Sequence, residues 1–132
     1  MRVLVLHAHP NPESYNAALF RLVVDGLRAG GHEVDACDLH AEDFQPVLSR
    51  AERAGYHAIP ANRSPVEAYV QRLEAAETLV LVYPVWNFGF PAILKGFLDR
   101  VFLPGVSFRI VDGLVQPNLQ HISRLMVVTT YG

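Results

Sequence analysis

The segment between His7 and Asn16 carries the polar groups of this chain that are best suited to bind an anion. It joins an apolar run to an expected helix, and a helix start offers free N–H groups and partial positive charge that suit phosphate. Ser14 and Asn16 add side-chain donors, and His9 can hold a phosphate oxygen. Alternatively, Ser14 only caps the helix while His7 and His9 pack or face solvent. The residues alone leave both interpretations open.

The pair His7 and His9 also suggests a metal, because side chains two residues apart on an extended segment project to the same side. A hydrolase that uses a metal or phosphate through these histidines is therefore one hypothesis. The sequence offers no third ligand nearby, whereas metal sites in proteins usually have three or four. We expect no metal site.

A second group of candidates lies in residues 84–89, which read Pro-Val-Trp-Asn-Phe-Gly and follow a strongly apolar run. Backbone groups of such a loop can bind the polar edge of a planar heterocycle, while Trp86 or Phe88 lies against its face. The alternative is that both aromatic side chains close the core or a subunit interface, where such residues are also common. The loop by itself does not decide between these functions.

A third group, Thr129, Thr130, Tyr131 and Gly132, follows the last apolar run. Its hydroxyl and backbone groups suit a ligand site, although a chain end can also simply fray. Loops at the carboxyl ends of parallel strands converge at one edge of the sheet. A flavin mononucleotide group requires a phosphate site, a planar aromatic site and a polar wall. The helix start, the aromatic loop and the third group of residues together offer these three features.

The elements that position these loops follow from hydrophobic periodicity. Short apolar runs predict parallel strands buried on both faces, and the weaker alternation in residues 32–39 predicts an edge strand. Apolar stripes of helical spacing alternate with the strands, which indicates a doubly wound, three-layer α/β sheet. Residues 41–63 show no clear period apart from a possible short helix at 49–55. The predicted strands are residues 2–7, 32–39, 78–83 and 124–130, and the predicted helices are 15–29 with Ser14 as N-cap, 64–76 with a Ser64–Glu67 capping box, and 91–102.

Composition limits the class of protein. The 132 residues suffice for a single domain, 1–132, with a substantial core, and 51% of them are hydrophobic. A net charge of -2 gives no electrostatic reason to expect nucleic acid as a partner. No apolar run approaches the roughly 20 residues that span a bilayer, so we expect no membrane insertion. With one cysteine, Cys37, and no signal-peptide pattern at the N-terminus, we expect a cytoplasmic location.

The longest distinctive string is residues 91–102, Pro-Ala-Ile-Leu-Lys-Gly-Phe-Leu-Asp-Arg-Val-Phe, preceded by Pro84 and the aromatic loop. With residues 9–16, the string Pro-Gly-Val-Ser-Phe at 104–108 and Thr129-Thr130 before Gly132, it resembles the flavodoxin-like NAD(P)H:quinone oxidoreductase family. That family includes the DT-diaphorase type and the bacterial modulator-of-drug-activity and potassium-efflux ancillary proteins. The resemblance extends over the whole chain and implies a flavodoxin-like fold.

The resemblance further implies FAD or FMN as cofactor, NAD(P)H as reductant, a quinone-like acceptor, a ping-pong cycle and a homodimer. Phe108 matches an aromatic position that, in the family, lines the substrate pocket of the neighbouring subunit. The residues that the resemblance places at the flavin are His9, Ser14, Tyr15, Asn16, Pro84, Val85, Trp86, Asn87, Phe88, Thr129, Thr130, Tyr131 and Gly132.

Family members continue for another helix, strand and helix, so we expect the C-terminal part of the domain to be missing from these 132 residues. That part holds the Tyr and His that assist hydride transfer in the diaphorase type, and the catalytic residues are therefore unassigned here. The competing hypothesis is a non-catalytic flavodoxin-fold subunit that regulates a partner such as a cation-efflux system.

Overall fold

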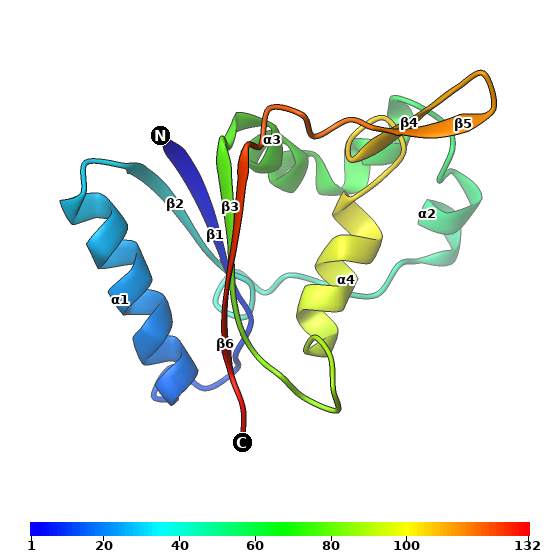
Figure 1. Cartoon of the computed structure of the whole chain (residues 1–132). Coiled ribbons are helices and arrows are strands. Elements are labelled where there is room, and N and C mark those ends of the chain that lie inside the picture. The colour runs from blue at the N-terminus through cyan, green and yellow to red at the C-terminus, as the bar shows by residue number, and fades with distance from the viewer.

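The computed structural model describes residues 1–132 and contains a parallel sheet with helices on both faces (Figure 1). The strands of this sheet lie in the order β2-β1-β3-β6, and every neighbouring pair is parallel. Two further strands, β4 and β5, form a separate antiparallel hairpin. The elements in chain order are β1 (Arg2–His7), α1 (Tyr15–Ala29), β2 (Glu33–Asp38), α2 (Arg50–Ala54), a 3₁₀ helix (Ala61–Val66), α3 (Glu67–Ala75), β3 (Thr78–Pro84), α4 (Ala92–Val101), β4 (Phe108–Val111), β5 (Leu114–Pro117) and β6 (Arg124–Thr130).

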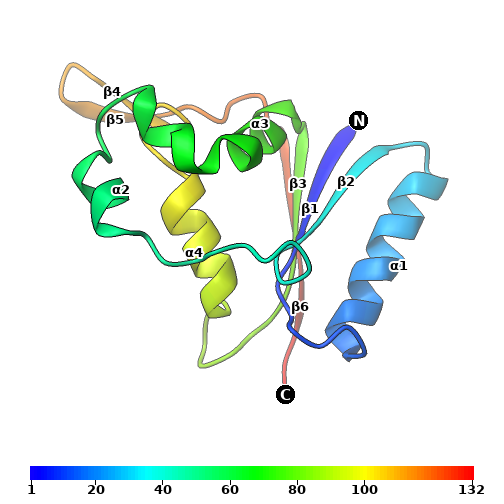
Figure 2. The same ribbon diagram turned by 180° about the vertical axis from the view of Figure 1, so that it is seen from behind.

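The sheet separates α1 on one face from α3 and α4 on the other, and the same layers are seen from behind in Figure 2. The larger core cluster lies on the α3 and α4 face and includes the fully buried side chains of Phe97, Leu94 and Leu6. A smaller cluster of valines, which includes Val5 and Val82, lies under α1. The predicted three-layer α/β architecture is confirmed. No helix combines the length and apolar character that a bilayer crossing requires.

Local signals position the first part of the chain as predicted. The Ser14 side chain accepts a hydrogen bond from Ala17 N at 3.0 Å and caps α1, which ends at Gly30. In the excursion after β2, Ser49 forms a capping box with Glu52 at the start of α2. The predicted edge strand is β2, and the strongly apolar β3 pairs on both sides, with β1 and β6.

The predicted start of the third helix at Ser64 is wrong. Residues 61–66 form the 3₁₀ helix, α3 begins at Glu67, and no side chain caps it. The Glu67 carboxylate accepts two hydrogen bonds from Arg63, whose guanidinium also donates to Glu74 at 2.8 Å. Glu67 is therefore held by a charged partner and does not reach back to close a capping box with Ser64.

The strand prediction missed the hairpin formed by β4 and β5. Its side chains are largely exposed, so there is no buried face to produce an apolar alternation. A signal existed in the dipeptide Asp112-Gly113, because both residues have positive φ, 51° and 76°, and Asp-Gly is typical of a two-residue hairpin turn. The hairpin lies at the end of the molecule that is opposite the C-terminus (Figure 1).

Helix α4 lies close to the excursion between β2 and α2. A Cβ atom added at Gly96 would come within 2.3 Å of Cβ and O of Pro46. The Arg100 guanidinium donates to Glu52 Oε1 at 2.8 Å and to the Gln45 carbonyl at 2.6 Å, which joins α4 to α2. The helix that follows the aromatic loop is thus fixed by close packing and by a largely buried ion pair.

Candidate cofactor-binding site

Three loops meet at the carboxyl end of the sheet and enclose a cleft of about 610 Å³. They follow β1, β3 and β6, which is the arrangement expected from their shared parallel direction. Every residue that lines the cleft belongs to the predicted cofactor-binding set. The lining residues are His9, Ser14, Tyr15, Asn16, Pro84, Val85, Trp86, Asn87, Thr130, Tyr131 and Gly132.

The remaining predicted residues lie elsewhere. Phe88 borders an adjoining hollow with Tyr83, Gly89 and Phe90, and Val85 and Tyr131 line both spaces. Thr129 pairs with Tyr83 and alternates with Thr130, so its side chain is on the opposite face of the sheet. Phe108 begins β4 at the far end of the molecule and does not contribute to the cleft of its own chain.

The start of α1 has the features of an anion site. The backbone N–H groups of Tyr15 and Asn16 have no partner within the chain, and the first turn contains no acidic residue. Because His9 Nδ1 accepts a hydrogen bond from Asn11 N at 3.0 Å, its Nε2 carries the proton in the neutral ring and remains available as a donor. Ser14 does cap the helix, but this leaves its hydroxyl proton free. Capping and anion binding are therefore compatible here.

The aromatic loop is a tight turn in a strained conformation. Trp86 and Gly89 exchange backbone hydrogen bonds of 3.1 Å, and the central residues Asn87 and Phe88 have φ values of 48° and 64°. Left-handed backbone is uncommon for a residue as bulky as Phe and is typical of functional sites. Val85 N donates to Thr130 O at 2.9 Å and ties the turn to β6.

Aromatic surface in this loop is exposed. Phe88 is fully exposed and Trp86 is 45% exposed, with its ring 5.5 Å from that of His9. The alternative that these side chains close the core of the chain is therefore wrong. A planar ligand or a subunit interface would cover this surface, and both are compatible with its position beside the cleft.

The two histidines do not share a site. His7 is buried and its ring stacks on Phe20 with 4.5 Å between centroids, whereas His9 contacts Trp86 at the cleft. The expectation that they project together is wrong, because the chain leaves extended geometry after β1. No group of three or more His, Cys, Asp or Glu side chains is arranged to hold a metal ion.

A buried polar atom at the floor of the cleft shows that the site contains unused hydrogen-bonding capacity. Asn16 is 2% exposed, and its Nδ2 donates to Thr130 Oγ1 at 3.1 Å. Its Oδ1 is buried without a hydrogen-bond partner. With free N–H groups above and exposed aromatic rings beside it, the cleft fits a ligand that has both an anionic part and a planar part.

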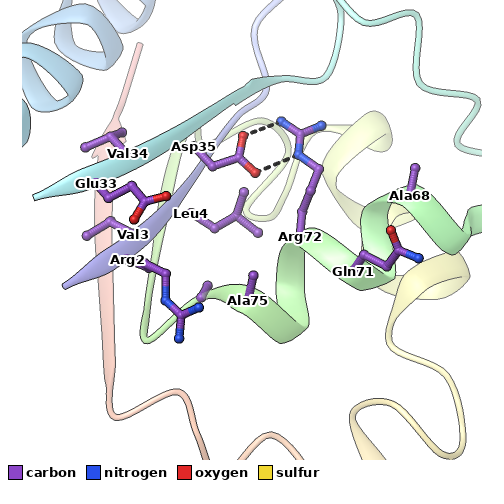
Figure 3. Close-up of a pocket in the computed structure, with 11 residues that line it drawn as sticks. Arg2, Val3, Leu4, Glu33, Val34, Asp35, Ala68, Gln71, Arg72 and Ala75 are labelled. Atoms are coloured by element: carbon purple, nitrogen blue, oxygen red, sulfur yellow. Dashed lines mark hydrogen bonds and ion pairs between the residues drawn. The ribbon is translucent and has the colours of Figure 1, made fainter.

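Sequence reasoning did not find a second hollow, of about 570 Å³, between the strands β1 and β2 and helix α3 (Figure 3). Ala68, Ala75 and Ala76 leave this space because their side chains are small. Arg72 dominates its polar wall, and its guanidinium donates to both carboxylate oxygens of Asp35, at 2.8 and 2.7 Å, and to Glu42. These partners hold the pKa of Arg72 above its ordinary value, so its charge is already used within the fold.

The strand order and the layers define a flavodoxin-like α/β domain, and the cleft lies between β1 and β3, where the strand order reverses. A family model described as a flavodoxin-like fold matches residues 1–132, and the chain belongs to this family. It is 31% identical to rat NAD(P)H dehydrogenase [quinone] 1 and 32% identical to orangutan ribosyldihydronicotinamide dehydrogenase [quinone], in each case over 99% of the chain. It covers 54% and 64% of those relatives, so it spans between about half and two thirds of their length.

Solved structures give the same result. The NAD(P)H:quinone oxidoreductase of Methanothermobacter marburgensis matches all of the chain with a TM-score of 0.86 and 27% identity, and 67% of that protein is covered. A quinone reductase described as putative from Klebsiella pneumoniae matches with a TM-score of 0.88 and 26% identity, again over the whole chain and over 60% of its own.

Proposed function

We propose that this chain is the flavin-binding part of an NAD(P)H:quinone oxidoreductase that acts as a homodimer in the cytoplasm. The observation that carries the proposal is the meeting of a free helix N-terminus, exposed aromatic rings and a polar strand end at one cleft. The names of the relatives supply the substrate classes, NAD(P)H and quinones. The lone cysteine, Cys37, is buried, which is compatible with a reducing compartment.

The residues of the chain divide the work of binding. The N–H groups of Tyr15 and Asn16, with His9 Nε2, are assigned to the phosphate, because they are the free donors at the positive end of α1. The loop from Pro84 to Phe88 is assigned to the ring system, and Thr130 to Gly132 form the third wall. When bound, FMN or FAD would supply hydride transfer from NAD(P)H to a quinone in a ping-pong cycle.

The proposed dimer gives a role to Phe108 and to the exposed hairpin formed by β4 and β5. Phe108 begins β4, away from the cleft of its own chain, which supports its assignment to the substrate pocket of a neighbouring subunit. Exposed apolar residues of β4 and β5, such as Ile110 and Leu114, lie beside it and provide surface for such a contact.

The test is a titration of the purified protein with FMN and with FAD, followed by absorption and flavin fluorescence. We expect saturable quenching with one of them, and NAD(P)H-dependent reduction of a quinone by the flavin-loaded protein. Absence of binding by both would overturn the proposal. Flavin binding without quinone reduction would favour the non-catalytic regulatory subunit.

A further inference from the structure

His7 is a buried titratable group that the proposed function leaves unexplained. It lies at the end of β1, 1% exposed, opposite Asp38 of β2 and Val82 of β3 in the strand register. Its Nδ1 is 3.3 Å from Asp38 Oδ2, and the other oxygen of that carboxylate accepts from Ala41 N at 3.2 Å. The carboxylate is thereby held in place against the histidine ring.

Asn16 lies one helical turn before Phe20, whose ring stacks on His7, so Asn16 is on the face of α1 that packs against His7. Neither ring nitrogen has a well-aligned hydrogen bond, and the same is true of Asn16 Oδ1. Burial lowers the pKa of His7, while Asp38 and Asn16 act in the opposite direction, which is the effect of acceptors near the ring. Asn16 Nδ2 donates to Thr130 Oγ1, so Asp38, His7, Asn16 and Thr130 lie in succession between the end of β2 and the cleft.

The number of N–H donors on the His7 ring differs between its protonated and neutral forms, so these polar groups have two hydrogen-bonding arrangements. In the protonated ring both nitrogens donate, one to Asp38 and one to Asn16 Oδ1, so Asn16 Nδ2 donates to Thr130 Oγ1. In the neutral ring Nδ1–H donates to Asp38 and Nε2 becomes an acceptor. The Asn16 amide must then turn, so that Nδ2 donates to His7 and Oδ1 accepts the Thr130 hydroxyl proton.

We propose that His7 is a positioning residue whose protonation sets the orientation of the Asn16 amide, and thereby decides whether the Thr130 hydroxyl can donate into the cleft. The effect on a flavin rests on the proposed function, whereas the coupling between His7 and Asn16 does not. The charged or titratable groups that face His7 are Asp38 on β2 and His9 in the following loop. The neighbours of His7 on α1 and β3 include Asn16, Phe20 and Val82, which do not titrate.

The coupling is measured first without any ligand, by NMR of the histidine ring nitrogens and the Asn16 side-chain amide as the pH is lowered. We expect the Asn16 signals to shift with the same midpoint as His7, on the acid side of an ordinary histidine. Asp38→Asn should move both midpoints together to lower pH, and His57→Gln, at an exposed and distant histidine, should move neither. Asn16 signals that do not follow the His7 titration would overturn the proposal.

The second measurement is FMN affinity above and below that midpoint. We expect binding to tighten about threefold to tenfold when His7 is protonated, the range of one additional hydrogen bond. In His7→Gln the pH dependence of FMN affinity should be limited to the part that comes from the ionisation of FMN itself. If this variant does not fold, Asp38→Asn provides the test, because it should shift the pH at which FMN affinity changes. An FMN affinity that does not change across the midpoint of the His7 titration would overturn this proposal and leave the proposed function intact. Failure of FMN and FAD to bind at any pH would overturn the proposed function, while the NMR result still decides the coupling.

Discussion

The two largest hollows of this molecule differ in how their polar groups are used. At the cleft, the N–H groups of Tyr15 and Asn16 are free, and Phe88 is held in a strained turn. In the hollow beside α3, the guanidinium of Arg72 is already satisfied by two carboxylates. Unsatisfied groups reduce stability and are available to a ligand, whereas satisfied groups stabilise the fold. Although both hollows are of similar size, this contrast supports the assignment of the proposed binding site to the cleft.

The largest effect on stability is expected away from the cleft, among groups that are already fully packed, where α4 contacts Pro46. Gly96→Ala should reduce the free energy of unfolding by about 2–3 kcal/mol, because the new methyl group overlaps backbone and ring atoms of Pro46. Gly26→Ala is the matched control, since a Cβ there meets nothing within 4 Å and should raise helix stability by up to about 1 kcal/mol. Chemical denaturation measures both, and equal effects would contradict the packing seen at Gly96.

Arg72→Met should destabilise the chain by about 2 kcal/mol, because it removes charged hydrogen bonds and leaves Asp35 and Glu42 without their partner. Flavin affinity should remain unchanged, since Arg72 is not part of the cleft. Chemical denaturation and an FMN titration of the same preparation test whether stability falls while flavin affinity stays the same. A loss of affinity in a variant that stays folded would show that the hollow beside α3 takes part in binding.

Tyr15→Glu should weaken FMN binding about tenfold, or roughly 1.4 kcal/mol, because it places a carboxylate beside the proposed phosphate site. Stability should rise slightly, because an acidic residue in the first turn of α1 is favourable. Tyr15→Gln controls for loss of the phenol ring. Riboflavin, which lacks the phosphate, should show the same affinity for both variants, and a tenfold difference for riboflavin would contradict the phosphate assignment.

Phe88→Gly should stabilise the chain by about 1 kcal/mol while it weakens flavin binding. The turn with Asn87 and Phe88 both at positive φ is the type that favours Asn-Gly, so the change relieves strain and removes the exposed ring. The thermal unfolding temperature should rise, while the FMN affinity measured by titration should fall. Unaltered affinity would mean that Phe88 serves an interface and not the flavin ring.

The last expected effect is a change in pH dependence. Because burial lowers the pKa of His7 in the folded chain below its ordinary value, the unfolded chain binds a proton over a pH range in which the folded chain does not. The stability linked to neutral His7 is therefore complete above the unfolded pKa and is lost as the pH falls toward the folded pKa. Thermal unfolding between pH 5 and 8 should show this slope in the wild type and a flatter one in His7→Gln.

The parts of the fold with local signals were predictable. The apolar runs of β1 and β3, the Ser14 cap and the Pro91 start of α4 need only neighbouring residues, and parallel direction brings the following loops together. The start of α3 was not predictable, because the Glu67 carboxylate binds the guanidinium of Arg63, which also donates to Glu74, eleven residues further along the chain. The hairpin after Ser107 lacked a buried face, so periodicity could not find it.

The sequence by itself determined the layer order, the position of the cleft and the types of residues at its wall, because these depend on periodicity and on chain direction. Only the tertiary structure decided which of those residues remain free to act. His7 is buried against Phe20, whereas His9 lies at the cleft. Phe88 is exposed in a strained turn, and the charge of Arg72 is balanced by carboxylates that are distant in the sequence. The physical reason is that hydrogen-bond satisfaction and exposure depend on partners brought in from far along the chain, which no local pattern records.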